Sequence, residues 1–380
     1  MNVMFLSHMF PNAGSPHSVP FMLERAKALA SCIPLEVVAP VSYFPFVKNK
    51  LPELYECIDN MPVYHPRYLA LPAFLWPMRS FPYSLMFRLF WQKRRAKYDI
   101  FHVEWIYPDA FAVTNFAKKK GIKTVGVVHG NEAIDYYGPR SRRKKYIEAF
   151  DALDKIIVVS NELKWKLIRE YQVTEEKISV ILNGVDVDKF IVRDKIESRK
   201  ELGLPLKGSV GVCVARLSEE KNLNILIQSV ANLPERVPVM YILGDGPLKG
   251  ELQGLIDRYD IGEWIKMVGP VSHEEIPLWL AASDFLCLPS QREGCPVVIH
   301  EALACGRPVI STTVGAIPDL IRHTDYGLLC PPSDVQALSH SLEEVMSRTW
   351  DVEKIAAYGQ QFTWENVAKQ TVEVFNEAMC

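Results

Sequence analysis

The chain has 380 residues, of which 48% are hydrophobic and 23% are charged, as in ordinary globular proteins. This composition excludes an intrinsically disordered or fibrous protein, and no run of about 18 uninterrupted apolar residues predicts a membrane span. Because the length exceeds the usual size of one hydrophobic core, we expect two domains. The opening residues, Met1–Ser7, have the character of a core strand rather than of a signal peptide, so we expect a cytoplasmic protein.

Charge is nearly balanced over the whole chain but uneven along it. Residues 1–185 carry 25 Lys and Arg against 17 Asp and Glu, whereas residues 186–380 carry 18 against 28. The basic first half indicates an anionic partner, such as a phospholipid surface at the inner face of the membrane or a phosphate-linked acceptor. A basic surface that is merely solvated is an equally good interpretation. We expect no nucleic-acid partner.

Eight cysteines lie along the chain without CxxC spacing. Four of them fall in apolar runs, which favours reduced thiols in the core. We therefore expect neither disulfides nor a zinc site.

Short β-branched runs alternate with amphipathic stretches in the first half of the chain. Strands that are apolar on both faces are typical of a parallel sheet with helices on each side. We expect helices at Phe21–Ala30 and Asn161–Tyr171. The expected strands are Val3–Ser7, Leu35–Pro40, Ile100–Trp105, Lys123–His129, Lys155–Ser160 and Ile178–Leu182.

The segment Tyr43–Tyr98 departs from this alternation. It mixes many aromatic residues and prolines with a basic cluster at Lys93, Arg94, Arg95 and Lys97. Aromatic and cationic groups together suit an interface with anionic lipid. A helical insert packed on the first domain is the alternative, because the prolines interrupt any long amphipathic helix.

The alternation resumes after a polar break near Asn183–Asp186, where we place the linker. Helices are expected at Asn222–Leu233 and Ile276–Ala282. The expected strands are Ser209–Ala215, Val237–Leu243, Ile265–Val268, Phe285–Pro289 and Pro308–Thr312. We predict an α/β protein with two doubly wound, Rossmann-like domains, residues 1–185 and 186–362, facing each other across a cleft. Residues 363–380 should form a helix that packs back on the first domain.

Residues Ser290–Gly306 follow an apolar strand and open a helix. We place Pro296 at the first helical position and expect Gly294 to let the backbone approach a ligand. The free N–H groups of the first turn would then face a phosphate. Glu293 and Glu301 flank this turn and suit a ligand with a sugar at each end of a diphosphate. The alternative is two glutamates that merely favour the helix dipole.

Arg216 and Lys221 span a second strand-to-helix turn. A guanidinium and an ammonium group there can clamp a diphosphate and neutralise the charge that grows on a leaving group. The alternative is a solvated turn in which Lys221 pairs with Glu219 or Glu220.

These motifs in this order resemble the retaining glycosyltransferase family 4, with the GT-B fold, over essentially the whole chain. The resemblance rests on the Glu293-to-Glu301 run and the Arg216/Lys221 pair, with supporting segments elsewhere. Those segments are Leu243–Pro247, Asn183–Asp186, Gly306–Ser311 and Val314–Gly315. The first domain is then expected to bind the acceptor and the second to bind a nucleotide sugar.

The resemblance also implies roles for single residues. Arg216 and Lys221 would hold the donor diphosphate, Glu293 the donor sugar and Glu301 the nucleotide ribose. His129 matches the histidine that touches the transferred sugar from the opposite wall. The other implied donor-binding positions are Gly14, Gly244, Gly246, Val271, Gly294, Cys295, Pro296 and Val297.

The implied activity is transfer of a sugar, with retention of configuration, from a UDP- or GDP-linked donor to a hydroxyl of a glycan or lipid-linked acceptor. Synthesis of a cell-envelope polysaccharide or glycolipid is the expected context, with no metal and no other cofactor. One departure from the family lies in the first loop, which has only Gly14 where relatives often have paired glycines. A nucleotide-sugar epimerase, a phosphorylase and a non-catalytic nucleotide-sugar-binding protein are the alternatives.

Overall fold

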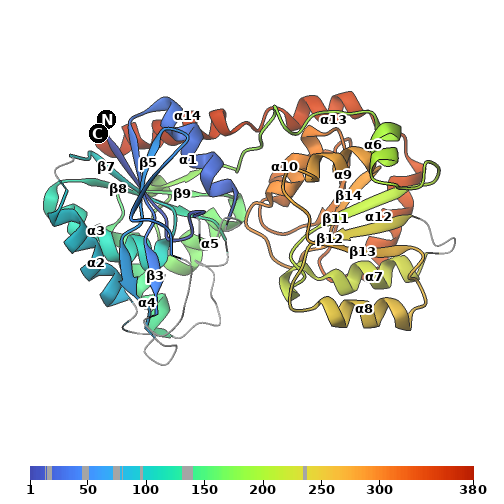
Figure 1. Cartoon of the computed structure of the whole chain (residues 1–380), viewed down its shortest axis with the longest axis horizontal. Helices are drawn as coiled ribbons and strands as arrows, with labels where there is room; N and C mark the ends of the chain where they lie inside the picture. Colours follow the sequence, from blue (N-terminus) through green and yellow to red (C-terminus); the bar gives the residue numbers. More distant parts are fainter. Residues whose placement is uncertain are drawn as a thin grey trace. The chain divides into compact units, whose positions relative to one another are not determined.

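The computed structural model describes residues 1–12, 14, 19–44, 51–71, 78, 80–94, 97–130, 140–233 and 238–380. It divides the chain into two compact units (Figure 1). The first comprises Met1–Leu182 together with Trp364–Cys380, and the second comprises Asn183–Thr363. Each unit is built on one main sheet, mostly parallel in the first unit and fully parallel in the second, with helices on both faces, so the predicted pair of Rossmann-like folds is confirmed.

The first unit contains an eight-stranded sheet in the order β10-β9-β8-β7-β1-β2-β5-β4. All neighbouring strands are parallel except β4 and β5. The chain order reverses between β1 and β7, which is the switch point of a doubly wound sheet. The strands are β1 (Val3–Leu6), β2 (Leu35–Val38), β4 (Tyr55–Ile58), β5 (Met61–Tyr64), β7 (Ile100–Val103), β8 (Lys123–Val128), β9 (Lys155–Val158) and β10 (Ile178–Val180).

Helices of the first unit cover both faces of this sheet (Figure 1). They are α1 (Phe21–Cys32), α2 (Ser80–Gln92), α3 (Phe111–Lys120), α4 (Arg140–Ala152), α5 (Asn161–Tyr171) and α14 (Trp364–Met379). The C-terminal helix α14 packs against α1, and its Phe375 ring meets the His102 ring edge-on at 5.2 Å. Its buried residues recur every three or four positions, so one apolar stripe faces the unit.

The segment Tyr43–Tyr98 contains strands as well as a helix, so an insert that is only helical is wrong. The hairpin β4–β5 turns at Asp59 and Asn60, whose φ angles of 48° and 64° are those of a two-residue type I′ turn. Strand β5 extends the main sheet beside β2. A separate two-stranded sheet pairs β3 (Val41–Tyr43) with β6 (Arg67–Leu69).

Part of the aromatic and basic set in this segment belongs to the core. Trp91 of α2 packs edge-on against Phe101 and Phe116 at centroid distances of 5.7 and 5.3 Å. Arg94 pairs with Glu36 and lies over the Tyr64 ring. Residues 45–50, 72–77, 79 and 95–96, which include Arg95 of the basic cluster, lie outside the described residues.

The second unit has a six-stranded, fully parallel sheet in the order β13-β12-β11-β14-β15-β16. Counted from β11, this is the order 3-2-1-4-5-6 of a doubly wound sheet, with its switch point between β11 and β14. The strands are β11 (Val210–Val214), β12 (Val239–Leu243), β13 (Ile265–Gly269), β14 (Phe285–Leu288), β15 (Val309–Thr312) and β16 (Gly327–Cys330).

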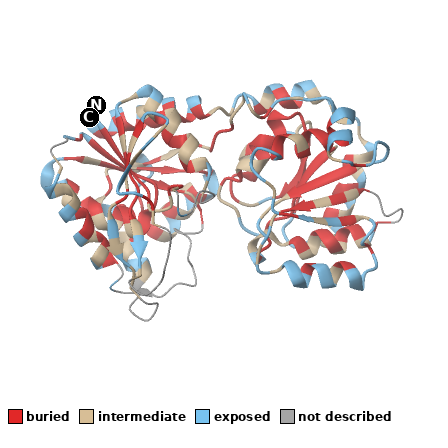
Figure 2. Cartoon of the chain, in the orientation of Figure 1, coloured by how far each residue is buried: buried red, intermediate tan, exposed pale blue. Residues whose placement is uncertain are grey.

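Several helices of the second unit, such as α7 and α8, bury one side and leave the other partly exposed, whereas α9 and α10 have no exposed residue. Figure 2 shows buried strands with exposed residues on the outer turns of the covering helices. The helices are α6 (Lys195–Glu201), α7 (Leu223–Ala231), α8 (Lys249–Arg258), α9 (Ile276–Ala282), α10 (Val297–Ala304), α11 (Ile317–Leu320), α12 (Val335–Ser347) and α13 (Val352–Gly359). Between α7, α8, α12 and the sheet lies one apolar cluster that includes Leu226, Ile242 and Leu342.

Helix α10 ends at a left-handed glycine. Gly306 has φ = 71°, and its N–H donates to Leu303 O at 2.9 Å. The next N–H, of Arg307, donates to Ala302 O at 2.9 Å, which completes a Schellman motif. A Cβ on Gly306 would lie 2.6 Å from Val352 Cγ1 and 2.7 Å from Val352 O. Both backbone conformation and packing against α13 therefore require glycine.

We predict that Gly306→Ala destabilises the protein more than Gly121→Ala does. Gly121 also ends a helix, with φ = 70°, but a Cβ there would meet nothing within 4 Å. Gly121→Ala should therefore lose only the left-handed backbone term, about 1 kcal/mol, whereas Gly306→Ala should lose about 3 kcal/mol because steric overlap is added. Urea denaturation of both variants measures this, and equal losses would contradict the packing argument.

Candidate active site

The loops that follow the parallel strands of the second unit gather at one edge of its sheet. Because all six strands run the same way, their carboxyl ends share this edge. Arg216 follows β11, Gly244 and Gly246 follow β12, Val271 follows β13, and Glu293 follows β14. The sheet thus brings together five predicted site positions that are scattered over nearly 80 residues of sequence.

A short ion pair at this edge joins the two motifs that flank the switch point. Lys221, in the short 3₁₀ turn Glu219–Lys221 after β11, donates from Nζ to Glu293 Oε1 at 2.6 Å. Ser290 Oγ donates to the same oxygen at 2.6 Å. Lys221 therefore pairs with Glu293, and not with Glu219 or Glu220 as the alternative interpretation holds. The Glu293 side chain is only 8% exposed, so its carboxylate is held in place.

Arg216 is an exposed cation at this edge. Its loop is fixed by backbone hydrogen bonds on either side, from Ala215 N to Leu243 O and from Leu217 N to Asp245 O, both at 3.0 Å. The guanidinium is consequently presented to solvent from an ordered loop.

Glycines permit the close packing of these loops. A Cβ on Gly244, which has φ = 139°, would lie 1.9 Å from Ala215 O, and a Cβ on Gly246 would lie 2.4 Å from Leu217 O. On the other side of the switch point, a Cβ on Gly315 would lie 2.5 Å from Glu293 O. The first two glycines therefore have a steric reason to be present whether or not they contact a ligand.

Helix α10 starts beside Glu293, with one correction to the predicted register. Pro296, with φ = −71° and ψ = 111°, is the N-cap, and Val297 is the first helical residue. The helix has no side-chain cap, which leaves its N-terminal N–H groups and the positive end of its dipole toward this edge. Gly294 O accepts Ala316 N at 2.8 Å, and Cys295 O accepts Asn183 Nδ2 at 2.9 Å.

Glu301 lies in the second turn of α10 and meets a histidine that the sequence analysis missed. His273 Nε2 donates to Glu301 Oε1 at 2.9 Å, and Lys189 Nζ donates to His273 Nδ1 at 3.0 Å. The lysine hydrogen bond leaves the His273 proton on Nε2, where it orients the buried Glu301 carboxylate. His273 comes three residues before the helix α9 and carries no motif, so spacing alone could not identify it.

His129 belongs to the first unit and follows β8 at the carboxyl edge of that sheet. Its Nε2 donates to Glu104 Oε2 at 2.7 Å. Glu104 also receives His102 Nε2 at 2.7 Å and pairs with Arg25 Nε at 3.1 Å. Burial by itself raises the pKa of Glu104, but Arg25 and the two histidines hold it well below its usual range. The fully buried carboxylate thereby orients the His129 ring, which packs against Trp105 and Phe21.

A second buried carboxylate lies at the same edge of the first unit. Asp109 Oδ2 accepts both His8 N and His8 Nδ1 at 3.1 Å, and Tyr83 OH donates to Asp109 Oδ1 at 2.5 Å. His8 then lines a cavity of about 330 Å³ together with Tyr68, Tyr107 and Arg142.

Gly14, the remaining predicted position, is an exposed turn residue whose N–H donates to Asn12 Oδ1 at 2.9 Å. Its neighbours 13 and 15–18 lie outside the described residues, as do residues 131–139 after His129. In the parts of the chain that the structure describes, no group of three or more His, Cys, Asp or Glu side chains is arranged to hold a metal ion.

Comparisons with known proteins agree with this geometry. The model of the glycosyl transferases group 1 matches residues 194–362, and the model of glycosyltransferase family 4 matches residues 24–189. An uncharacterized glycosyltransferase, MJ1607, from Methanocaldococcus jannaschii is 26% identical over 87% of each chain. The putative teichuronic acid biosynthesis glycosyltransferase TuaC of Bacillus subtilis is 27% identical over 90% of this chain and 88% of TuaC.

Among solved structures, Anabaena Alr3699/HepE in complex with UDP superimposes with a TM-score of 0.77 at 19% identity, over 99% of this chain and 100% of that one. This similarity concerns the fold. The two family models together span most of the sequence, and the chain belongs to the group 1, family 4 glycosyltransferases, with the GT-B fold.

His300, next to Glu301, makes the second unit sensitive to acid. It is fully buried, its ring stands edge-on to Phe362 at 5.2 Å, and burial lowers its pKa to about 4. The unfolded chain therefore takes up this proton near the ordinary pKa of about 6.5, while the folded chain does so only near 4. The free energy of unfolding must fall as the pH drops through this window.

Between pH 7.5 and pH 5.5 the free energy of unfolding should decrease by about 1 kcal/mol less in His300→Leu than in the unaltered protein, because leucine takes up no proton. Urea denaturation at the two pH values measures the difference. His340→Leu, at an exposed position of the same unit, is the matched control and should leave the loss unchanged. An unchanged loss in His300→Leu would show that this histidine is already charged in the folded protein.

Proposed function

We propose that this glycosyltransferase transfers a sugar from a nucleotide diphosphate donor to an acceptor hydroxyl with retention of anomeric configuration and without a metal ion. The observation that carries the proposal is the Lys221–Glu293 contact beside the uncapped start of α10. An ammonium group, a guanidinium and free helix N–H groups at one sheet edge form an environment for a diphosphate. The related fold of Anabaena Alr3699/HepE has UDP in its complex, which supports a nucleotide-linked donor.

In this proposal each described side chain of the edge has one task. Arg216 and Lys221 neutralise the charge that develops on the departing diphosphate, and the backbone N–H groups of Gly294, Cys295 and Val297 assist. Glu293, held by Lys221 and Ser290, accepts hydrogen bonds from donor sugar hydroxyls. Glu301, oriented by His273, accepts from the ribose hydroxyls. Gly244, Gly246 and Val271 belong to the adjoining loops and would line the donor site.

The transfer itself needs no covalent intermediate on the protein. The bond from the anomeric carbon to the phosphate oxygen breaks as the acceptor oxygen attacks the face being vacated, and the acceptor proton passes to that phosphate oxygen. His129, oriented by Glu104, would contact the transferred sugar. We assign the acceptor to the first unit, where the cavity beside His8 presents Tyr68, Tyr107 and Arg142. A cell-envelope glycan or lipid-linked acceptor is supported by the similarity to TuaC.

We predict that Arg216→Ala lowers kcat/KM about a hundredfold, equivalent to roughly 2–4 kcal/mol of transition-state stabilisation, with an unchanged melting temperature. The exposed position of Arg216 explains why folding should be unaffected. Arg258→Ala, at an exposed position on α8, is the matched control. Nucleotide release is measured with the UDP-, GDP- or ADP-linked sugar that raises the melting temperature most.

Full turnover by Arg216→Ala would remove this residue from the mechanism. NMR of the product determines its anomeric configuration and so tests retention. Turnover measured in EDTA tests independence from a metal ion, and it should be undiminished. An isomerised sugar formed from donor alone would identify an epimerase instead.

Contact with the membrane is the second part of the proposal, and helix α2 carries it. Its buried face includes Tyr83 and Phe87, while its opposite face exposes Phe81, Leu85 and Leu89 at intervals of four residues. These three side chains are 66%, 46% and 50% exposed. An apolar stripe on a surface helix of a basic unit suits the interface of an anionic bilayer. None of the helices in the described ranges is long and apolar enough to cross a membrane.

We predict that Leu85→Glu weakens binding to phosphatidylglycerol vesicles about tenfold, since it removes one leucine from the apolar interface and adds a repelled charge. Leu206→Glu is the matched control, because Leu206 is equally exposed, at 47%, but lies in the second unit. Sedimentation with vesicles measures both variants. Equal effects of the two substitutions, or no binding by the unaltered protein, would exclude α2 as the docking surface.

A further inference from the structure

The second unit has a basic cavity at the edge opposite the candidate active site. The cavity holds about 340 Å³ and is lined by Ser209, Asp284 and Pro308, the residues that immediately precede β11, β14 and β15. The amino ends of parallel strands share one edge, so this cavity is separated from Arg216 and Glu293 by the length of the strands, roughly 13–16 Å. It is therefore a different site on the same sheet.

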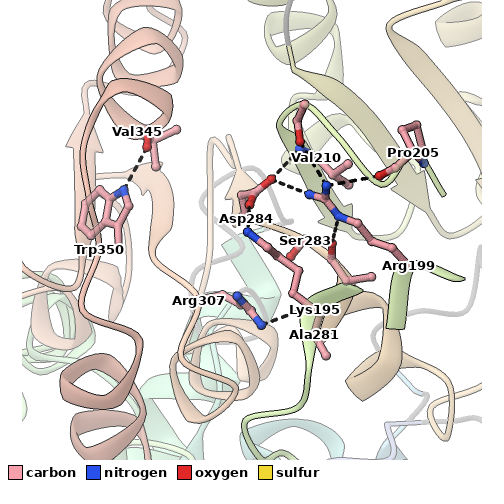
Figure 3. A network of polar contacts seen from close by, with 12 residues as sticks. Lys195, Arg199, Pro205, Val210, Ala281, Ser283, Asp284, Arg307, Val345 and Trp350 are labelled. Atoms are coloured by element: carbon pink, nitrogen blue, oxygen red, sulfur yellow. Dashed lines mark hydrogen bonds and ion pairs between the residues drawn. The ribbon is translucent and has the colours of Figure 1, made fainter. Parts of the chain in front are cut away.

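Asp284 organises one wall of this cavity. Lys195 Nζ and Arg199 Nη2 each donate to it at 2.7 Å, and Val210 N donates to Oδ2 at 2.7 Å. Figure 3 shows both basic side chains converging on this single carboxylate. Arg199 is almost fully buried and also donates to Ala282 O, Pro205 O and Gly208 O. All three of its nitrogens have acceptors, so Arg199 is a structural residue.

Arg307 is only partly satisfied. Its Nη2 donates to Ala281 O at 2.9 Å, near the end of α9, as Figure 3 shows. Arg307 lines the cavity and is 95% buried. Its Nε is buried as well and has no hydrogen-bond partner among the described residues. Burial lowers the pKa of this guanidinium. Arg307 makes no ion pair among the described residues, so its charge in the cavity wall is left without a counter-ion.

Arg348 and Trp350 also line the cavity. The Arg348 guanidinium lies 4.6 Å from the centroid of the Trp350 ring, and the indole N–H donates to Val345 O at 2.9 Å. Arg348 also reaches Asp325 at 3.3 Å, at the rim. Lys195, Arg307 and Arg348 are thus three basic side chains lining a cavity whose only lining acid, within the described residues, is Asp284. Because Arg199 also pairs with Asp284, the cavity retains an excess of positive charge.

Capping of helix α9 explains part of this arrangement. The helix ends at Ala282, and Arg199 and Arg307 donate to the carbonyl oxygens of its last two residues. Cations at a helix C-terminus stabilise its dipole. Capping does not account for the absence of a carboxylate partner of Arg307 among the described residues, nor for Lys195 and Arg348 around the same cavity.

We propose that this cavity is a binding site for a small soluble phosphomonoester. Lys195, Arg307 and Arg348 would contact its phosphate oxygens, and Trp350 would cover its uncharged part. A phosphate would give Arg307 a counter-ion, and it would replace the contact of Arg348 with Asp325 by a full charge pair. The site is independent of the transfer reaction, because it uses none of the residues placed at the carboxyl edge.

The test is calorimetric titration of the full chain with glycerol 3-phosphate at constant ionic strength, with glycerol as the uncharged reference. We expect one site per chain whose affinity is unchanged by saturating UDP. Lys195→Gln and Arg348→Gln should each lower the affinity at least tenfold without changing the melting temperature. Arg322→Gln, at an exposed position of the same unit, is the matched control and should bind as the unaltered protein does.

Arg216→Gln separates this site from the donor site, since it should weaken binding of UDP but leave binding of glycerol 3-phosphate intact. Absence of binding, equal affinity in the Lys195 and Arg348 variants, or displacement of glycerol 3-phosphate by UDP would each overturn the proposal. Inorganic phosphate binding as tightly as glycerol 3-phosphate would exclude a role for Trp350 and reduce the site to one for free phosphate.

Discussion

Parallel pairing of β11 with both β12 and β14 is the constraint on which the second unit depends. After β11 the chain continues to β12 on one side, and after β14 it continues to β15 on the other side. The loops after the adjacent strands β11 and β14 must therefore lie next to each other. The 2.6 Å contact between Lys221 and Glu293, 72 residues apart, follows from this arrangement. The Glu293 carboxylate can remain charged with little access to solvent, because Lys221 pairs with it and Ser290 donates a further hydrogen bond to the same oxygen.

Close packing of the loops makes the carboxyl edge stiff. Gly244 and Gly246 let the turn after β12 lie directly on Ala215 and Leu217, and Gly315 does the same for the backbone at Glu293. Groups that stabilise developing charge are effective when they need no reorganisation during the reaction. In the proposed mechanism, the glycines therefore serve the transfer through the rigidity of the loops that they permit.

The two edges of this sheet are both suited to anions, for different reasons. At the carboxyl edge, the uncapped start of α10 and the cations after β11 provide positive potential. At the amino edge, Arg199 and Arg307 donate to the last carbonyl groups of α9, and the surplus of basic side chains around Asp284 leaves positive charge in a cavity. In the first unit, buried carboxylates orient histidine side chains: Glu104 orients His129, and Asp109 orients His8.

The amino-acid sequence alone determined the alternation of strands and helices, the doubly wound class and the ordered motifs from Arg216 to Gly306, because apolar periodicity and turn residues are local properties. It did not predict the β4–β5 hairpin, whose Asp-Asn turn stands in an aromatic segment without clear alternation, or the N-cap position of Pro296. Only the tertiary structure decided that Lys221 pairs with Glu293 rather than with its sequence neighbours, that His273 orients Glu301, and that Arg307 faces a basic cavity. Each of these depends on side chains that are far apart in sequence and meet only when parallel strands place their loops at a common edge.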